Sequence, residues 1–245
     1  MTNTATKTDH MVYLKDMEVL SDSNIMEQVL EAVQCYDDTL YTAEDVKNAL
    51  AKENRGFKEF QALLSPAAEP FLEEMAQKAQ SETLKHFGNS ISIFTPLYIS
   101  NYCENHCVYC GFNCRNAIRR AKLDINAIEQ EMQSISKTGL EEILILTGES
   151  RIHSDVKYIG EACKMAKKYF KMVGIEVYPM NTEEYAYLHQ CGVDYVTVFQ
   201  ETYNSDKYET LHISGHKRIF PYRFYAQERA LRGGMRGVAF AALLG

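Results

Sequence analysis

The stretch ISIFTPLYISNYCENHCVYC, residues 91–110, joins a β-rich run directly to three closely spaced cysteines. The first half of the stretch is rich in β-branched and aromatic residues, which favour a strand. Cys103, Cys107 and Cys110 follow the end of that strand, and Cys114 comes four residues later. The stretch therefore predicts a strand whose carboxyl end carries a sulfur-rich loop, and the fold must hold that loop in place.

Short β-rich runs alternate with amphipathic helical patterns in the rest of the chain. Further strands are predicted at 142–148, 174–179, 195–200 and 237–245, and helices at 124–138, 154–172, 182–191 and 221–232. This order predicts a parallel α/β sheet with right-handed crossovers, in either an open doubly wound sheet or a (β/α) barrel. Both folds place their functional residues at the carboxyl ends of the strands. In this sequence Gly148-Glu149, Pro179 and Gln200-Glu201 occupy those positions. Because a closed barrel has eight strands, the five strands predicted here would form a partial TIM-type (β/α) barrel.

The residues before this alternation carry helical patterns only. Helices are predicted over 23–35, from Thr42 through Leu50, and from Ser65-Pro66 to about His86 with a stop at Gly88. A proline beyond the first turn forfeits a backbone hydrogen bond, so Pro70 makes a start nearer residue 69 the alternative for the third helix. The sequence thus predicts an N-terminal helical segment over 1–88 and an α/β core over 89–245.

The composition predicts a soluble globular protein, and the lack of a membrane span or secretory signal makes the cytoplasm the expected location by default. The chain of 245 residues is 46% hydrophobic and has a formal net charge of −7, spread along its length. The sequence contains no run of about 18 apolar residues, the length that a membrane span needs. The N-terminus MTNTATKTDH lacks the apolar stretch of a secretory signal. The dispersed negative charge argues against nucleic acid as a partner.

Seven cysteines occur in the chain, and four of them are crowded into the loop after the first strand. In a reducing compartment, such crowding indicates a metal site rather than disulfide bonds. Cys35, Cys163 and Cys191 stand alone within helical patterns, where small buried hydrophobic residues are expected.

Three structures would account for the crowded cysteines. Cys103, Cys107, Cys110 and Cys114 would share one face of a helix, but the segment follows a strand and contains Gly111. Four thiolates would also satisfy a structural zinc, although zinc sites usually draw on two separated pairs. The third alternative is a [4Fe–4S] cluster held by three thiolates, which would leave one iron free to bind a substrate or cofactor.

The third alternative matches a known signature. The spacing Cys103-x3-Cys107-x-Tyr109-Cys110 resembles the motif of the radical S-adenosylmethionine (SAM) enzymes. That resemblance implies a full or partial (β/α) barrel in which the open iron chelates SAM. The reduced cluster would cleave SAM to methionine and a 5′-deoxyadenosyl radical, which abstracts hydrogen from the substrate.

The same resemblance implies roles for residues near the cysteines. Thr147-Gly148-Glu149 matches the glycine–glutamate motif of the family, whose carboxylate accepts hydrogen bonds from the ammonium group of SAM. Tyr109 would lie close to the adenine of SAM, with ordinary packing as the alternative. Cys114 lies beyond the motif and would take no part in holding the cluster.

Longer segments narrow the resemblance to the tyrosine lyases of this family. The segments PLYISNYC, LILTGES, FQETYNSDKYETLHISGHKR and RALRGGMRGVAFAALLG are similar to that group, most closely to its ThiH type, the 2-iminoacetate synthases of thiamine biosynthesis. The resemblance covers about residues 57–245. It implies radical cleavage of the Cα–Cβ bond of L-tyrosine to 2-iminoacetate and p-cresol. A flavodoxin- or ferredoxin-type reductant protein and thiazole synthase would be the partners.

Two alternatives stand beside this function. The HydG-type tyrosine lyase of [FeFe]-hydrogenase maturation is closely related and carries a second cluster in a C-terminal extension. A noncatalytic iron–sulfur or zinc module would instead use all four cysteines as ligands. Because tyrosine lyases continue well beyond the length of this chain, the resemblance also implies an N-terminal fragment with an incomplete barrel, poor cluster binding and little tyrosine turnover.

Polar residues at other strand ends are candidates for substrate contacts. Tyr98 and the pair Gln200-Glu201 would face the same end of the sheet as the cysteines, where they would contact SAM or tyrosine or form a polar packing network. A basic run is predicted to be a solvated loop and helix face rather than a ligand site; it consists of Arg115, Arg119, Arg120 and Lys122.

Overall fold

The computed structural model of the protein describes residues 8–244, and residues 1–7 and 245 lie outside the described part, including the last residue of the strand predicted at 237–245. The chain forms two compact units. One consists of the residues up to Leu30 together with those from Ile93 onward, and the other is Glu31–Ser92.

The unit Glu31–Ser92 is helical, as its sequence predicts. Its elements are the end of α1 (Ile25–Cys35), a 3-10 turn (Asp38–Leu40), α2 (Ala43–Ala51), α3 (Phe57–Leu64), a second 3-10 segment (Pro66–Phe71) and α4 (Leu72–Phe87). The hydroxyl of Thr42 accepts from the backbone N–H of Asp45, whose carboxylate accepts from the N–H of Thr42, so the predicted helix start is confirmed as a capping box.

The helix predicted over 65–86 is wrong in its first part. Pro66–Phe71 is a 3-10 segment with Pro70 inside it, and the α-helix begins only at Leu72. A proline within an α-helix removes a backbone donor, which explains the delay. Helix α3 was not predicted from the sequence, because its start is marked by Gly56 rather than by a polar cap side chain.

The other unit contains a five-stranded parallel sheet, as predicted. Its strands are β1 (Phe94–Ser100), β3 (Glu142–Thr147), β4 (Met172–Glu176), β5 (Tyr195–Thr197) and β7 (Gly237–Ala239), paired in that order. The helices between them are α5 (Ile125–Ser136), α6 (Val156–Ala166), α7 (Thr182–Gln190) and α10 (Ala226–Arg232).

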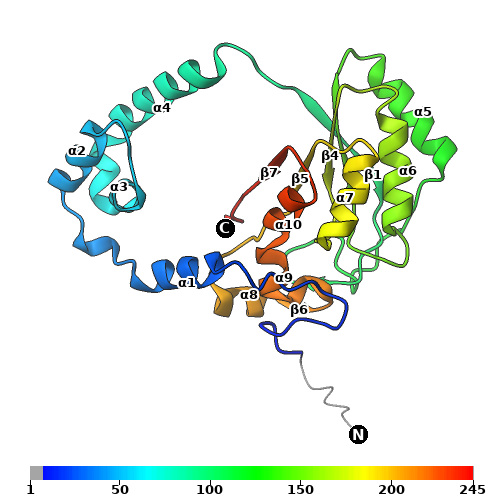
Figure 1. Ribbon diagram of the computed structural model, residues 1–245, viewed down its shortest axis with the longest axis horizontal. Coiled ribbons are helices and arrows are strands. Elements are labelled where there is room, and N and C mark those ends of the chain that lie inside the picture. The colour runs from blue at the N-terminus through cyan, green and yellow to red at the C-terminus, as the bar shows by residue number, and fades with distance from the viewer. Residues whose placement is uncertain (1–7, 245) are drawn as a thin grey trace, which may run out of the picture. The chain divides into compact units, whose positions relative to one another are not determined.

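The strand order decides between the two predicted architectures. A doubly wound sheet reverses its strand order at a switch point, whereas here every strand pairs with the next parallel strand along the chain. Consecutive helices also pack against each other, α5 on α6, α6 on α7, and α7 on α10 (Figure 1). The sheet is therefore wound in one direction, as in a (β/α) barrel, and its five strands form part of such a barrel.

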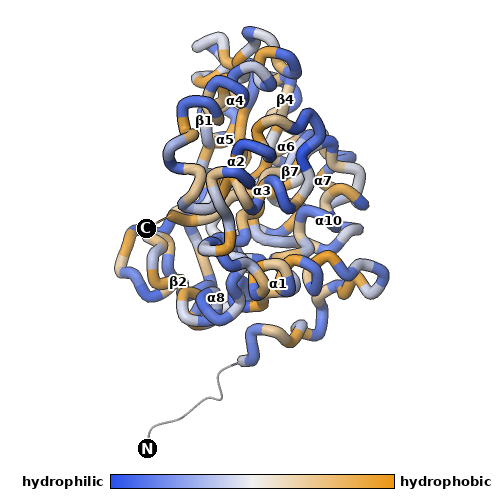
Figure 2. The backbone as a smooth tube through the Cα atoms, turned by 90° about the vertical axis from the view of Figure 1, so that its left-hand side faces the viewer, coloured by the Kyte–Doolittle hydropathy of each residue, from blue (hydrophilic) through white to orange (hydrophobic). Residues whose placement is uncertain are grey.

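Buried aliphatic side chains join this sheet to its helices. Ile143 and Ile145 of β3 are fully buried and belong to one core cluster with Ile128 and Met132 of α5. Each such side chain contributes about 1.5–3 kcal/mol by leaving water. Hydrophobic and hydrophilic residues both occur along the helices (Figure 2), as expected for helices with one buried face.

Several elements differ from their predicted extent. The strand predicted over 195–200 ends at Thr197, and the one predicted over 237–245 ends at Ala239. The helix predicted over 221–232 consists of α9 (Phe220–Phe224) and α10, separated at Tyr225. Three further features were not predicted from the sequence: α8 (Ser205–Leu211), the 3-10 turn His216–Arg218, and an antiparallel pair of β2 (His106–Cys107) and β6 (His212–Ser214).

The three isolated cysteines differ in exposure. Cys163 in α6 and Cys191 at the end of α7 are buried, as predicted for small hydrophobic residues. Cys35 is exposed at the end of α1, so the prediction of burial is wrong for this residue. No helix in the described part of the chain has the length and apolarity needed to cross a membrane.

Candidate functional site

A cavity of about 360 Å³ opens at the carboxyl ends of the parallel strands. Eight of the nine residues that the sequence analysis proposed for the site line it: Cys103, Cys107, Cys110, Tyr109, Gly148, Glu149, Tyr98 and Glu201. Gln200 does not. It is buried, its Nε2 donates to the carbonyl of Phe220 at 3.4 Å, and its Oε1 has no partner among the described residues.

Hydrogen bonds from side chains to backbone carbonyls hold the cysteine loop in place. The guanidinium of Arg120 donates to the carbonyls of Asn101, Phe112 and Asn113 at 2.7, 2.9 and 2.7 Å. The side chain of Asn113 in turn donates to the carbonyl of Cys107 at 2.8 Å. Arg120 therefore closes the loop, and the prediction that it belongs to a solvated face is wrong for this residue.

The short pair β2–β6 fixes the middle of the loop. Cys107 lies opposite His212 in this pair, and His212 Nδ1 lies 2.9 Å from the carbonyl of Tyr208. A carbonyl only accepts, so Nδ1 carries the proton and Nε2 accepts from the hydroxyl of Tyr109 at 2.7 Å. Burial, reinforced by the nearby Lys217 ammonium, lowers the pKa of His212 to about 3 and keeps it neutral. His212 thereby orients Tyr109.

Asn105, between the first two cysteines, connects three segments of the site. Its Nδ2 donates to Glu149 Oε2 at 2.9 Å, and its Oδ1 accepts from the backbone N–H of Lys217 at 2.9 Å. Gly215 permits this approach, because it has φ 93° and an added Cβ would lie 2.3 Å from the Asn105 Oδ1. The cysteine loop, the end of β3 and the segment after β6 are thus tied to one amide group.

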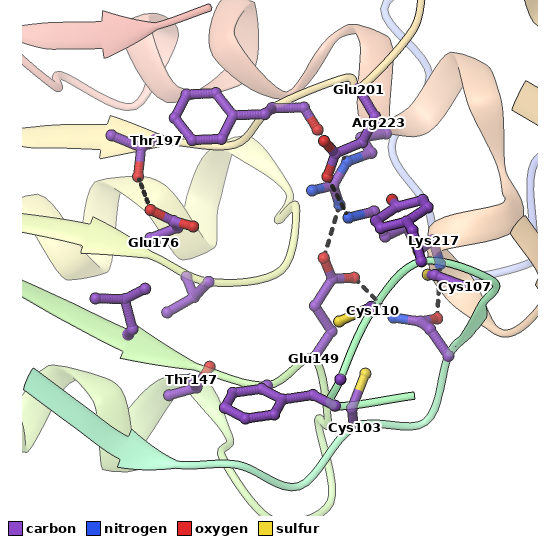
Figure 3. Close-up of a pocket in the computed structure, with 18 of the residues that line it drawn as sticks. Cys103, Cys107, Cys110, Thr147, Glu149, Glu176, Thr197, Glu201, Lys217 and Arg223 are labelled. Carbon is purple, nitrogen blue, oxygen red and sulfur yellow. Dashed lines mark hydrogen bonds and ion pairs between the residues drawn. The ribbon is translucent and has the colours of Figure 1, made fainter. Parts of the chain in front are cut away.

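Glu149 forms a buried ion pair with Arg223 (Figure 3). Their side chains are 14% and 5% exposed, and Arg223 Nη1 lies 2.8 Å from Glu149 Oε1. Burial alone would raise the pKa of Glu149, but Arg223 and Lys217 outweigh this effect and hold the pKa below its usual range. Arg223 is itself anchored by donating from Nε to the carbonyl of Phe199 at 2.6 Å. The cavity therefore contains a carboxylate that stays ionised.

Two more carboxyl groups line the cavity. Glu176, the last residue of β4, accepts from the hydroxyl of Thr197 at 3.2 Å, and burial raises its pKa. Glu201 pairs with Lys217 at 2.7 Å and has φ 71°, an uncommon conformation for a residue with a side chain. Sequence reasoning missed Asn105, Lys217, Arg223 and Glu176.

The donor set includes the three thiols that a cluster with one open iron requires. Cys103, Cys107 and Cys110 are free thiols that line one cavity (Figure 3). In the described part of the chain, no three His, Cys, Asp or Glu side chains come together as ligands of one metal ion. A four-iron cluster spreads its thiolates more widely, because each thiolate binds a different iron. Cys114 is exposed, outside the cavity lining, and its N–H donates to the Asn105 carbonyl at 2.9 Å.

Gly148 lets the end of β3 approach the cysteine loop. A Cβ added at Gly148 would lie 2.3 Å from the carbonyl oxygen of Tyr102, whose ring stacks on His153 at 3.9 Å. We therefore expect Gly148→Ala to displace the loop, to lower the free energy of unfolding by about 1–3 kcal/mol, and to reduce iron bound after reconstitution by more than half. Urea unfolding and iron analysis measure the two effects.

Gly111→Ala is the matched control for this prediction. Gly111 lies in the same loop, and an added Cβ there would meet nothing within 4 Å. We expect it to retain wild-type stability and iron content. Equal losses in the two variants would contradict a specific requirement for glycine at 148.

Known proteins are similar in sequence to this chain. A profile of the Radical SAM superfamily matches residues 97–244. The 2-iminoacetate synthase of Salmonella typhimurium is 39% identical over 204 residues, which are 83% of this chain and 54% of that protein. The 3-methylornithine synthase of Methanosarcina acetivorans is 26% identical over 193 residues, which are 76% of this chain and 55% of that protein.

A solved structure also shares its fold. The crystal structure of HydG, a maturase of the [FeFe]-hydrogenase, matches with a TM-score of 0.75 at 28% identity, over 89% of this chain and 49% of that one. The chain thus spans about half the length of the relatives it matches.

Proposed function

The chain belongs to the radical SAM superfamily, and from this premise we propose that Cys103, Cys107 and Cys110 hold a [4Fe–4S] cluster. Members of this superfamily use such a cluster together with SAM. The observation that carries the proposal is the convergence of the three thiols with Gly148 and Glu149 on one cavity. When bound, the cluster supplies the electron that cleaves SAM.

The residues of the cavity support binding of SAM. Glu149 remains ionised beside Arg223, and a carboxylate is the acceptor best suited to an ammonium group. Its oxygens accept from Arg223 and Asn105, which leaves part of their acceptor capacity for a ligand. Tyr109, held by His212, presents a fixed aromatic ring for the adenine.

We further propose that the reaction is cleavage of the Cα–Cβ bond of L-tyrosine to 2-iminoacetate and p-cresol. The 39% identity to a 2-iminoacetate synthase supports this reaction. Tyr98 and Glu201 line the cavity and are candidates to contact tyrosine, whereas Gln200 is buried outside the lining and would act only through its neighbours. Thiazole synthase would receive the 2-iminoacetate for thiamine synthesis.

A tyrosine lyase of the HydG type is the second candidate, favoured by the TM-score of 0.75 to HydG. An assay coupled to thiazole synthase separates the two, because only a 2-iminoacetate synthase is expected to support formation of the thiazole.

The chemistry of the thiols supports a proposed cell compartment. Three free cysteines that are proposed to bind iron are best kept in a reducing compartment, so the cytoplasm is the proposed location. A flavodoxin- or ferredoxin-type protein is the proposed reductant.

Anaerobic reconstitution tests the proposed function. The protein is supplied with iron and sulfide, reduced with dithionite, and incubated with SAM, with or without L-tyrosine. We expect 5′-deoxyadenosine only in the reduced samples. We expect p-cresol, at the low turnover predicted for this chain, only where tyrosine is also present; liquid chromatography measures both products. A cluster that assembles fully but releases no 5′-deoxyadenosine would instead support the noncatalytic module.

A further inference from the structure

The charged groups of the cavity are unequal in number. Among the described residues, three carboxyl groups and two side-chain cations line it. Glu149 pairs with Arg223 at 2.8 Å. Glu201 pairs with Lys217 at 2.7 Å. Both cations are thus taken, and Glu176, the third carboxyl group, has no ion-pair partner within the described part of the chain.

Glu176 is held in place by a neutral group. It is the last residue of β4, which pairs with β3 on one side and with β5 on the other. The hydroxyl of Thr197, the last residue of β5, donates to Glu176 Oε2 at 3.2 Å. A carboxylate can accept about four hydrogen bonds, so most of its acceptor capacity is left for a ligand. The protein therefore orients this carboxyl group without neutralising it.

The surroundings of Glu176 make the missing counter-ion costly. Glu176 is half-buried, and burial raises the pKa of its carboxyl group. The apolar side chains of Leu146, Val177 and Phe199 line the same cavity. A carboxylate that is partly removed from water gains most from a ligand that brings both a positive charge and hydrogen-bond donors. An ammonium group supplies both.

Glu176 lies away from the cysteines along the sheet. The strands pair in the order β1, β3, β4, with the cysteine loop after β1 and Glu149 after β3. Adjacent strands are about 4.8 Å apart, so the end of β4 is about 10 Å from the end of β1. Figure 3 shows Glu176 and Thr197 on the left, away from the three cysteines. A molecule bound at Glu176 would lie beyond one bound at Glu149, as a second reactant must.

We propose that Glu176 is a substrate-binding residue whose carboxylate receives the α-ammonium group of the amino-acid substrate. This inference rests on the proposed function and extends it, because it names the group that selects an amino acid. Glu149 takes the ammonium group of SAM, and Glu176 takes that of the substrate, each through charge-assisted hydrogen bonds. Thr197 is a positioning residue, since its hydroxyl holds the Glu176 carboxylate.

A comparison of two ligands in the variant Glu176→Gln tests the proposal. L-Tyrosine and its deaminated analogue, 3-(4-hydroxyphenyl)propionate, share the ring and the carboxylate, and only tyrosine carries the amino group. Calorimetry measures the binding of each to the cluster-loaded protein with SAM present and without a reductant, so that no turnover occurs. We expect Glu176→Gln to bind tyrosine at least about tenfold more weakly than wild type, and to bind the analogue within about twofold of wild type.

Two further variants control for charge and for orientation. Glu161→Gln removes the same charge from an exposed position on α6 and is expected to bind both ligands as wild type does. Thr197→Val keeps the Glu176 carboxylate but removes its hydroxyl donor, and is expected to weaken the binding of tyrosine alone, by about two- to fivefold. Equal weakening of tyrosine by Glu176→Gln and Glu161→Gln would reduce the effect to net charge and overturn the proposal. Equal weakening of both ligands by Glu176→Gln would overturn it as well, because the residue would then have only a packing role.

Measurements with SAM separate this inference from the proposed function. Titration with SAM alone is expected to give the same affinity for Glu176→Gln as for wild type, and a loss of SAM affinity would assign the residue to SAM and overturn the proposal. A wild type that releases 5′-deoxyadenosine but binds tyrosine no better than the analogue would refute the role of Glu176 alone. Failure of the wild type to release 5′-deoxyadenosine with dithionite would refute the proposed function and, with it, this inference.

Discussion

Replacing Cys103, Cys107 or Cys110 by alanine is expected to abolish cluster assembly, whereas Cys114→Ala should leave iron and sulfide content close to that of wild type. The three thiols line one cavity, and Cys114 is exposed outside it. Each thiolate in a cluster binds its own iron, so the loss of one is not made good by the other two. Iron and sulfide analysis and the visible absorbance of the reconstituted variants measure the effect.

Folding must be separated from metal binding in these variants. Cys107 is only 4% exposed, so its truncation also removes some packing. Circular dichroism of the metal-free variants provides the check, since we expect all four to melt within a few degrees of metal-free wild type. If Cys114→Ala loses its iron as completely as Cys110→Ala does, the four-cysteine binding module is the better description of the site.

The sequence predicts the strands and their direction because each strand combines a buried aliphatic run with a neighbouring helical pattern. Val173 and Ile175 of β4, for example, are fully buried and stand in the middle of such a run. Strand order was not predictable, because the same alternation serves a doubly wound sheet and a barrel. The choice between these two folds depends on which strands pair, and the local sequence pattern does not indicate the pairing.

The residues of the candidate site likewise fall into those that the sequence predicts and those that it does not. Cys103, Cys107, Cys110 and the pair Gly148-Glu149 are found from sequence because they are contiguous motifs at strand ends. Arg223 was missed because it reaches Glu149 from α9, and the pairing joins residues 74 positions apart. A signal was nevertheless present, since an arginine within the apolar run IFPYRF must find a partner if that run is buried.

Asn105 and Lys217 are two further residues of the site that the sequence did not predict. Asn105 is prominent in the sequence only as a spacer between two cysteines, yet it is 1% exposed and both ends of its amide are used. The spacing of the cysteines indicates the ligands, but the groups that orient the ligands come from segments about a hundred residues away, and their positions follow only from the folded chain.

Arg223→Met is expected to be among the most destabilising single substitutions in this unit. Arg223 and Glu149 are buried together, and the substitution leaves the Glu149 carboxylate without its strongest partner. Breaking a buried pair on one side costs about 3–5 kcal/mol, because the remaining charge stays desolvated. Urea unfolding of the metal-free protein at pH 7 measures the loss. The double variant Glu149→Gln with Arg223→Met removes both charges and is expected to recover part of it.

The loss of stability caused by Arg223→Met is expected to depend on pH. In wild type the pKa of Glu149 lies below its usual range, so the stability contributed by its ionised form is present above the unfolded pKa of about 4.3 and is lost as pH falls through the folded pKa. Without Arg223, burial raises the folded pKa of Glu149, so the carboxyl is protonated at acid pH and the penalty disappears there. The destabilisation by Arg223→Met should therefore shrink as pH is lowered from 7 toward about 4.

Arg232→Met is the control for this prediction. Arg232, like Arg223, forms ion pairs, in its case with the carboxylates of Asp22 and Glu228, but its side chain is 36% exposed. Exposed ion pairs contribute about 0–1 kcal/mol, so the control is expected to lose little stability at any pH. A small loss in Arg223→Met, or one that grows as the pH falls, would mean that water or another cation already compensates Glu149. The carboxylate would then owe its ionised state to something other than Arg223, and the arginine would have no special part in preparing the site for an ammonium group.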